Sequence, residues 1–185
     1  MNIQDLFNLD KKIAFISGGA TGIGRMAAEA MAMAGARVLI ASRKGSLCAS
    51  VAEELNQKGY KGTVEGFEGD LSSEAGVEAV VKEIKIRTGQ LNILMNNAGR
   101  SWGAPLGSFP HNAWGKVMSL NVAGLFSLTQ SLIPLLEKSA THEDPARVIN
   151  VGSVMGEIPM GDGAYSYSAS KAAVHQITKV LAKEL

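Results

Sequence analysis

The sequence predicts an α/β domain in which a doubly wound parallel sheet carries helices on both faces. Short apolar segments of strand length alternate with segments of helical periodicity along the whole chain. Such alternation requires crossover connections between parallel strands, and these are right-handed in nearly all known sheets. The chain also contains 21 glycines without a visible period, which indicates tight turns rather than a fibrous repeat.

Length, charge and cysteine content limit the possible classes of protein. A chain of 185 residues, 46% of them hydrophobic and 19% charged, fits one globular domain over residues 1–185. Its 18 basic and 17 acidic residues nearly cancel, so no overall field favours nucleic acid or an anionic membrane as a partner. The single cysteine, Cys48, excludes an internal disulfide, and we find neither a signal-peptide pattern nor a run of about 18 apolar residues. We therefore expect a cytoplasmic protein without a membrane span.

Five segments have the length and composition of buried strands. KIAFIS is rich in β-branched and aromatic residues and runs into glycines. LNILM is largely apolar, as expected for a strand that is covered on both faces. The predicted strands cover residues 12–17, 37–42, 63–71, 91–99 and 147–153.

The segments between and after these strands have helical periodicity. Leu47, Val51 and Leu55 lie four residues apart on one face, and Gly59 closes that helix. Gly35 ends the preceding helix in the same way. The predicted helices cover residues 23–34, 45–58, 73–88, 111–137 and 165–185.

The end of the first strand has the composition of a phosphate-binding turn. SGGATGIG (17–24) places Gly18, Gly22 and Gly24 between strand and helix, where a backbone can turn sharply and approach a pyrophosphate. The spacing differs from G-x-G-x-x-G, although Gly22, Gly24 and Ala27 satisfy G-x-G-x-x-A. The alternative is a tight strand–helix turn that binds no ligand.

The end of the second strand should select the cofactor. An NAD site has Asp or Glu about 20 residues beyond the glycines, and here that region reads ASRKGS (41–46), without an acid. Ser42, Arg43 and Lys44 can instead bind and neutralise a 2′-phosphate. NADP(H) is therefore favoured and NAD(H) remains possible, while an ordinary solvated loop is the alternative reading of the two basic residues.

Polar residues also follow the third and fourth strands. Asp70 can accept from an adenine amino group, or it can cap a turn or helix. In NNAG (96–99), the asparagines can tie down a turn, and the alanine and glycine let a flat ring lie close to the backbone. A purely structural turn is the alternative here.

The segment YSYSASK (165–171) at the start of the last helix carries the candidate acid–base group. Tyr167 has Lys171 as its i+4 neighbour on one helical face, whereas Tyr165 has an alanine there and is expected to pack or to line the pocket mouth. A free phenol ionises at a pKa of about 10, and a neighbouring ammonium favours the phenolate. With Ser153 at the end of the fifth strand, this pair predicts proton transfer by Tyr167.

Taken together, these motifs resemble the short-chain dehydrogenase/reductase family in its compact single-domain form. They occur in the order of the family and cover nearly the whole chain. The matching segments are SGGATGIG (17–24), DL (70–71), NNAG (96–99), LNVAG (120–124), VINVGS (148–153) and YSASK (167–171). The resemblance implies a Rossmann-type sheet, a bound nicotinamide cofactor and no metal.

The resemblance also implies a role for each site residue. Tyr167 donates a proton to a carbonyl oxygen, Ser153 orients that oxygen, Lys171 holds the nicotinamide ribose and assists the tyrosine, and Asn121 supports a water chain. The expected cofactor-binding residues are Ser17, Gly18, Thr21, Gly22, Ile23, Gly24, Ser42, Arg43, Lys44, Asp70, Leu71, Asn97, Ala98, Gly99, Tyr167 and Lys171.

The sequence departs from the family in three places. Thr21 replaces a basic residue that NADPH-using relatives often carry in the glycine loop, and the interval from Ser153 to Tyr167 is one residue longer than usual. The family continues past Leu185 through further strands and a segment that covers the substrate. We therefore expect the C-terminal part of the fold to be missing, an unpaired sheet edge after the fifth strand, low activity and a tendency to aggregate.

The substrate and the assembly are less constrained. Loop residues suggest an apolar or mixed carbonyl or alcohol substrate, and no arginine cluster marks a charged one. The candidate substrate contacts are Trp102, Ser153, Met155, Tyr165 and Tyr167. The resemblance implies a homodimer or homotetramer, and His175 is interpreted as a surface or interface residue.

The leading hypothesis is an NADPH-dependent reductase of a ketone or a 3-oxoacyl group, since the chain is similar to 3-oxoacyl-carrier-protein reductases. A non-catalytic dinucleotide-binding regulatory subunit is one alternative. An NAD-dependent alcohol dehydrogenase, or epimerisation or dehydration with a recycled cofactor, are others on the same scaffold.

Overall fold

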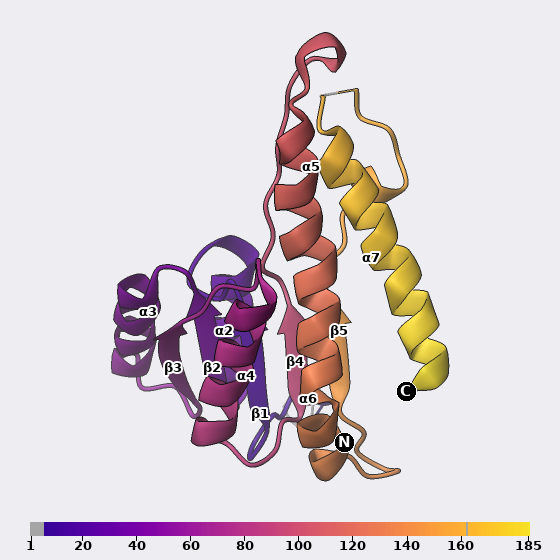
Figure 1. The fold of residues 1–185 in the computed structure, drawn as a ribbon. Coiled ribbons are helices and arrows are strands. Elements are labelled where there is room, and N and C mark those ends of the chain that lie inside the picture. Colours follow the sequence, from indigo (N-terminus) through magenta and orange to yellow (C-terminus); the bar gives the residue numbers. More distant parts are fainter. Residues whose placement is uncertain (1–5, 162) are drawn as a thin grey trace.

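A computed structural model describes residues 6–161 and 163–185 and contains one five-stranded parallel sheet (Figure 1). The strand order is β3-β2-β1-β4-β5, so the chain first builds outward from β1 in one direction and then in the other. The strands are β1 (Ile13–Ser17), β2 (Arg37–Ser42), β3 (Thr63–Glu68), β4 (Ile93–Asn96) and β5 (Arg147–Asn150). The reversal of direction lies between β1 and β4, where a doubly wound fold opens its ligand crevice.

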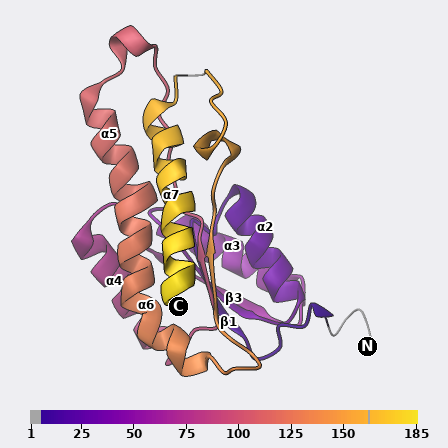
Figure 2. The ribbon, with the colours of Figure 1, turned by 90° about the vertical axis from the view of Figure 1, so that its right-hand side faces the viewer.

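The helices form a layer on each side of the sheet, as predicted. Figure 2 shows α2 and α3 on one face and α4, α5, α6 and α7 on the other, with α5–α6 and α7 side by side. Their bounds are α2 (Gly22–Met33), α3 (Gly45–Gln57), α4 (Glu74–Arg87), α5 (His111–Met118), α6 (Leu125–Ser139) and α7 (Tyr165–Glu184). Short 3-10 turns, η1 (Leu106–Ser108) and η3 (Val154–Gly156), lie in the loops that precede α5 and α7.

Alternation along β1 shows how the sheet supplies two cores. Ala14 and Ile16 belong to the cluster beneath α2 and α3, while Phe15 belongs to the cluster beneath α4 and α6. All three side chains have no exposed surface. A central parallel strand is buried on both faces, which explains why its sequence is apolar without alternation.

One predicted helix is in fact three consecutive segments. The sequence predicts a single helix over 111–137, but six residues of π-helix, η2 (Ser119–Gly124), separate α5 from α6. A Cβ on Gly124 would collide with the carbonyl oxygen of Leu71, so this turn packs directly on the backbone after β3. The wide turn depends on that tertiary contact, and helical periodicity does not reveal it.

The combined helix 111–139 also has the length and composition that crossing a membrane requires. Its mean hydropathy is 1.3 over the most apolar window, of which 44% is buried inside the protein. Leu128 and Leu132 have no exposed surface and pack in the core beneath the sheet. A core helix passes the same test, and the burial of its apolar face accounts for the composition here.

The third, fourth and fifth strands each end three residues earlier than predicted. Sheet pairing stops at Glu68, Asn96 and Asn150, because the following residues leave the ladder to form the loops described below. These strand ends still lie at the same edge of the sheet, where the sequence places the candidate site.

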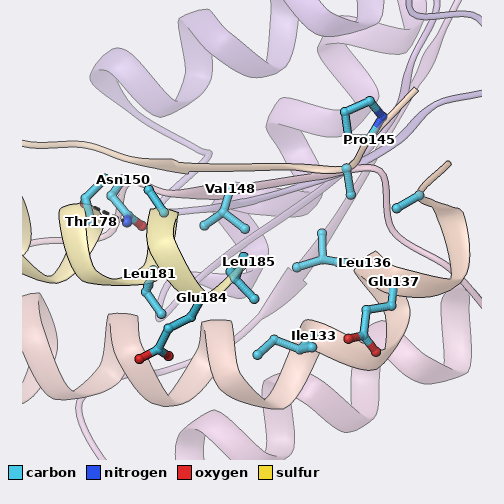
Figure 3. Close-up of a pocket in the computed structure, with 13 residues that line it drawn as sticks. Ile133, Leu136, Glu137, Pro145, Val148, Asn150, Thr178, Leu181, Glu184 and Leu185 are labelled. Carbon is cyan, nitrogen blue, oxygen red and sulfur yellow. Dashed lines mark hydrogen bonds between the residues drawn. The ribbon is translucent and has the colours of Figure 1, made fainter. Parts of the chain in front are cut away.

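β5 forms one edge of the sheet, as expected from the sequence. It pairs with β4, and no other described strand lies on its other side. Figure 3 shows an apolar groove beside β5 that is lined by Val148 and Leu181. The Asn150 side-chain amide, which also lines this groove, donates a hydrogen bond of 2.9 Å to the Thr178 hydroxyl. Ile149 is 40% exposed on this strand.

We predict that Gly66→Ala destabilises the fold. Gly66 lies in β3 directly under α3, and a Cβ there would collide with the carbonyl oxygen of Cys48. The backbone of two packed elements must separate to admit the methyl group, which should lower the free energy of unfolding by about 1–3 kcal/mol. Urea denaturation followed by circular dichroism measures this change. Gly107→Ala is the control, because a Cβ at Gly107 meets no atom within 4 Å, and equal stability loss in both variants would contradict the contact.

Candidate active site

The carboxyl ends of the strands open into two cavities that meet at Gly99. One lies over β1, β2 and the third strand end, and is lined by Ser17, Gly18, Thr21, Ser42, Arg43, Lys44, Asp70, Leu71, Ala98 and Gly99 among others. The other lies between β4, β5 and α7, and is lined by Ile23, Asn97, Gly99, Trp102, Ser153, Met155, Tyr167 and Lys171 among others. The fold thus brings most of the predicted site residues to two adjoining cavities. Outside both described linings are Gly22, Gly24, Asn121 and Tyr165.

The glycine loop is shaped by backbone requirements. Gly18 has φ +68° and Gly22 has φ +51°, conformations that residues with a Cβ rarely adopt. Gly24 does not line either cavity, and a Cβ there would collide with the carbonyl oxygen of Gly18. Its role is close packing of α2 against the loop, while Gly18 and Thr21 face the cavity.

Side-chain hydrogen bonds of Ser17 and Asn97 join the ends of β1 and β4. The Ser17 hydroxyl accepts the backbone N–H groups of Asn97 and Ala98, both at 3.0 Å. The Asn97 amide donates to the carbonyl oxygens of Ser17 and Gly18 at 3.0 and 3.1 Å. Asn97 thus ties down a turn, as predicted, and Ala98 and Gly99 after it line the first cavity.

The second and third strand ends are basic and acidic respectively. Arg43 and Lys44 are exposed at the cavity, and the Ser42 hydroxyl accepts the Lys44 N–H at 3.2 Å. Asp70 accepts the N–H of Ser72 at 2.9 Å and therefore stabilises a turn. Burial alone would raise the pKa of Asp70, but hydrogen bonds from Ser72 and the charges of Arg43 and Arg100 lower it overall.

These residues fit a dinucleotide with a phosphorylated ribose. No described side chain caps the N-terminus of α2, so first-turn N–H groups of this helix remain able to bind an anion. The glycines leave backbone exposed there, and Arg43 and Lys44 line the same cavity with the positive charge that binding of a 2′-phosphate would require. Asp70 lines the same cavity and retains acceptor capacity beyond its turn.

Tyr167 and Lys171 lie together in the second cavity. The Lys171 ammonium is 5.7 Å from the centroid of the Tyr167 ring, and it donates to the carbonyl oxygen of Val151 at 2.6 Å. Lys171 is only 6% exposed. Its burial lowers its pKa below the ordinary 10.5, because removal from water disfavours the charged form.

Ser153 caps a turn and also lines the second cavity. It is the N-cap of η3, where its hydroxyl accepts the Met155 N–H at 3.3 Å. The same residue lines the cavity with Tyr167 and Lys171. A capping hydroxyl keeps acceptor and donor capacity, so this contact leaves it able to bind a second partner.

Asn121 lies in the π-helix η2 and holds the loop after β4. Its Oδ1 accepts the Arg100 N–H and its Nδ2 donates to the Arg100 carbonyl oxygen, both at 2.9 Å. The second Nδ2 proton goes to the Ser170 hydroxyl at 2.9 Å, on α7 next to Lys171. Asn121 is 1% exposed, so its amide joins three elements of the site from within.

Not every predicted contact lies in the crevice. Trp102 and Met155 line the second cavity as expected, but Tyr165 lies outside its described lining. The Tyr165 ring instead packs edge-on against Phe109, with 5.4 Å between centroids. Arg100 was not predicted, although its position directly after NNAG could have suggested that it lines the same opening.

A profile of the family described as short chain dehydrogenase matches residues 12–185. The chain belongs to this family. It is an oxidoreductase of the short-chain dehydrogenase type, and its fold is the one that the sequence predicts.

Individual relatives show the same likeness over most of this chain. The rhamnolipid-biosynthesis 3-oxoacyl-[acyl-carrier-protein] reductase of Pseudomonas aeruginosa is 49% identical over 97% of this chain and 69% of that protein. The Pseudomonas aeruginosa RhlG/NADP active-site complex, also 49% identical, covers the same shares with a TM-score of 0.91. A gluconate 5-dehydrogenase from Burkholderia cenocepacia, solved with NADP and tartrate, is 30% identical, with a TM-score of 0.86 over 99% of this chain and 69% of that one.

We predict that the buried ammonium of Lys171 makes stability depend on alkaline pH. The folded chain holds this proton less tightly than the unfolded chain, so the cost is full below the lowered pKa of the folded state and disappears above 10.5. The free energy of unfolding of the wild type should therefore rise relative to that of Lys171→Met as the pH approaches 10.5 from below. Urea titrations at a series of pH values measure the difference, with Lys183→Met as the control for loss of an exposed charge on α7. A difference that is flat or falls with pH would contradict the assignment.

Proposed function

We propose that this short-chain dehydrogenase transfers hydride between NADP(H) and a carbonyl or secondary alcohol, acting chiefly as a reductase of a ketone or 3-oxoacyl group. The observation that carries the proposal is the pairing of Tyr167 with the buried Lys171 in a cavity that meets the dinucleotide crevice at Gly99. A proton donor and a hydride carrier must both reach one carbonyl group. The junction of the two cavities at Gly99 would allow both to do so.

In this proposal each residue has a separate task. NADP(H), when bound, supplies or accepts the hydride. The Tyr167 hydroxyl gives its proton to the carbonyl oxygen, and the Ser153 hydroxyl orients that oxygen and stabilises its developing charge. Lys171 uses one of three donors on Val151, which leaves two for a ribose hydroxyl or a water. Asn121 positions the backbone at Arg100, and the free lone pair of its Oδ1 can support a proton-supplying water.

The cofactor preference rests on the second strand end. Arg43 and Lys44 are placed for a 2′-phosphate, and the position that an NAD site fills with a carboxylate is Ser42. Two solved relatives, RhlG and the gluconate 5-dehydrogenase, contain NADP. Thr21 at the glycine loop offers no additional positive charge, so the discrimination is assigned to Arg43 and Lys44.

The substrate is a small molecule with an apolar portion. Trp102, Met155 and Ile23 line the second cavity beside the candidate catalytic residues. Relatives that are 49% and 33% identical are 3-oxoacyl-[acyl-carrier-protein] reductases from Pseudomonas aeruginosa and Aquifex aeolicus, which supports a 3-oxoacyl substrate. A homodimer or homotetramer in the cytoplasm completes the proposal.

A regulatory subunit that binds the dinucleotide without turnover is the competing function. It has no use for a proton donor, yet Tyr167, Lys171 and Ser153 line one cavity. Epimerisation or dehydration with a recycled cofactor would consume no NADPH, so net oxidation of NADPH by a panel of ketones separates these chemistries.

We predict that Tyr167→Phe abolishes reduction and spares cofactor binding. The change removes the proton donor and leaves the ring beside Lys171, so kcat should fall by at least about 100-fold while the Kd for NADPH stays within about two-fold. The assay is NADPH oxidation with the ketone panel, in the whole protein that carries this chain. Tyr165→Phe is the matched control, because Tyr165 packs against Phe109 outside the cavity and should retain activity. Persistent reduction by Tyr167→Phe would overturn the assignment.

We predict that Arg43→Ala weakens NADPH much more than NADH. Only the 2′-phosphate should contact the guanidinium, so we expect the Kd for NADPH to rise about ten-fold or more and that for NADH to change by less than two-fold. Titration of intrinsic fluorescence with each cofactor measures both constants. Arg25→Ala, which removes a half-buried arginine that is paired with Glu54 and lines neither cavity, is the control. Equal losses for both cofactors would show that Arg43 does not discriminate between them.

A further inference from the structure

His175 lies beneath the turn that carries Ser153, and the proposed function gives it no role. Its side chain is only 25% exposed and packs against residues 152–156. A Cβ on Gly152 would lie 2.8 Å from His175 Cδ2, and one on Gly156 would lie 2.9 Å from His175 Cε1. The two glycines make room for the imidazole, which fills the inner side of the turn.

The imidazole also makes a polar contact with this turn. The backbone N–H of Ser153 donates to His175 Nε2 at 3.3 Å. A neutral imidazole that accepts at Nε2 carries its proton on Nδ1. Nδ1 is buried without a hydrogen bond among the described residues, and it lies 3.4 Å from a carboxylate oxygen of Glu157, which favours a proton on that nitrogen.

The position of His175 connects two parts of the proposed catalytic group. It lies on α7 one turn beyond Lys171, while Ser153 belongs to the loop after β5. Lys171 reaches the same loop through the carbonyl oxygen of Val151. Two successive turns of one helix therefore hold the backbone of residues 151 and 153, on either side of Gly152.

We propose that His175 is a positioning residue that fixes the backbone of Ser153, and with it the Ser153 hydroxyl, relative to Tyr167 and Lys171. This role requires the tautomer in which Nε2 accepts and Nδ1, 3.4 Å from the Glu157 carboxylate, carries the proton. His175 does not touch the substrate or cofactor; it acts through Ser153. The catalytic part of this inference rests on the proposed function, whereas the contact with the turn does not.

The test compares three replacements of His175 in the whole protein that carries this chain. Gln places a polar atom near the position of Nε2 and can accept the Ser153 N–H, Asn reaches only as far as Nδ1, and Leu fills space without an acceptor. We expect kcat for ketone reduction to fall about ten-fold in His175→Leu and His175→Asn, as loss of one positioning hydrogen bond predicts, and to recover to within about three-fold in His175→Gln. The Kd for NADPH should stay within about two-fold in all three.

A double-mutant cycle decides whether His175 acts through Ser153. Once Ser153→Ala has removed the hydroxyl, a further His175→Leu change should cost less than about two-fold in residual activity. An equal ten-fold cost in both backgrounds, or a His175→Gln variant as slow as His175→Leu, would overturn the proposal.

Hydrogen exchange measured by mass spectrometry gives a readout that is independent of turnover. Amide exchange in residues 152–157 should be faster in His175→Leu than in His175→Gln, with exchange in β1 unchanged as the control for global unfolding. Equal exchange in the two variants would overturn the contact even if the protein reduced no ketone in the panel. Faster exchange in His175→Leu, without any reductase activity in the wild type, would contradict the proposed function and still support the contact between His175 and the turn.

Discussion

A single buried ammonium determines how the last helix meets the sheet. Lys171 is 6% exposed and bonded to Val151, so α7 cannot rotate or slide along β5 without leaving a charge unpaired in the interior. Such a charge is costly to bury, and proteins retain it only where partners compensate. One hydrogen bond to a carbonyl oxygen satisfies one donor of three, which makes the cavity side of this group the natural place for a polar ligand.

Several polar side chains in and around the two cavities hold the backbone in place. Ser17 and Asn97 join the ends of β1 and β4, and Asn121 joins the following loop to α7 through Ser170. The chemistry is left to a small number of groups whose surroundings are already fixed. This arrangement agrees with catalysis by preorganised groups, which need no rearrangement as charge develops.

Local rules were sufficient wherever one segment decides the outcome. The strand and helix order follows from periodicity, and the i, i+4 rule alone selects Tyr167 over Tyr165 as the partner of Lys171. Local rules do not predict contacts between segments that are distant in the sequence. The packing of Tyr165 on Phe109 and of His175 beneath residues 152–156 depends on loops that the sequence does not place relative to α7. The early ends of β3 and β5 have the same origin, since periodicity does not say where a strand leaves its neighbour.

The π-helical turn at Ser119–Gly124 separates two parts of the long helix that pack against different neighbours. An α-helix rotates by about 100° per residue, and a wide turn absorbs roughly one extra residue without breaking the chain of hydrogen bonds. The buried residues of α5 and α6 therefore do not have to follow one 3.6-residue period across the turn. In Figure 1, α6 lies beside the sheet, while α5 lies beside the first turns of α7. The π-helical turn therefore joins two helical segments that have different packing partners, and Asn121 within this turn bonds to Ser170 on α7.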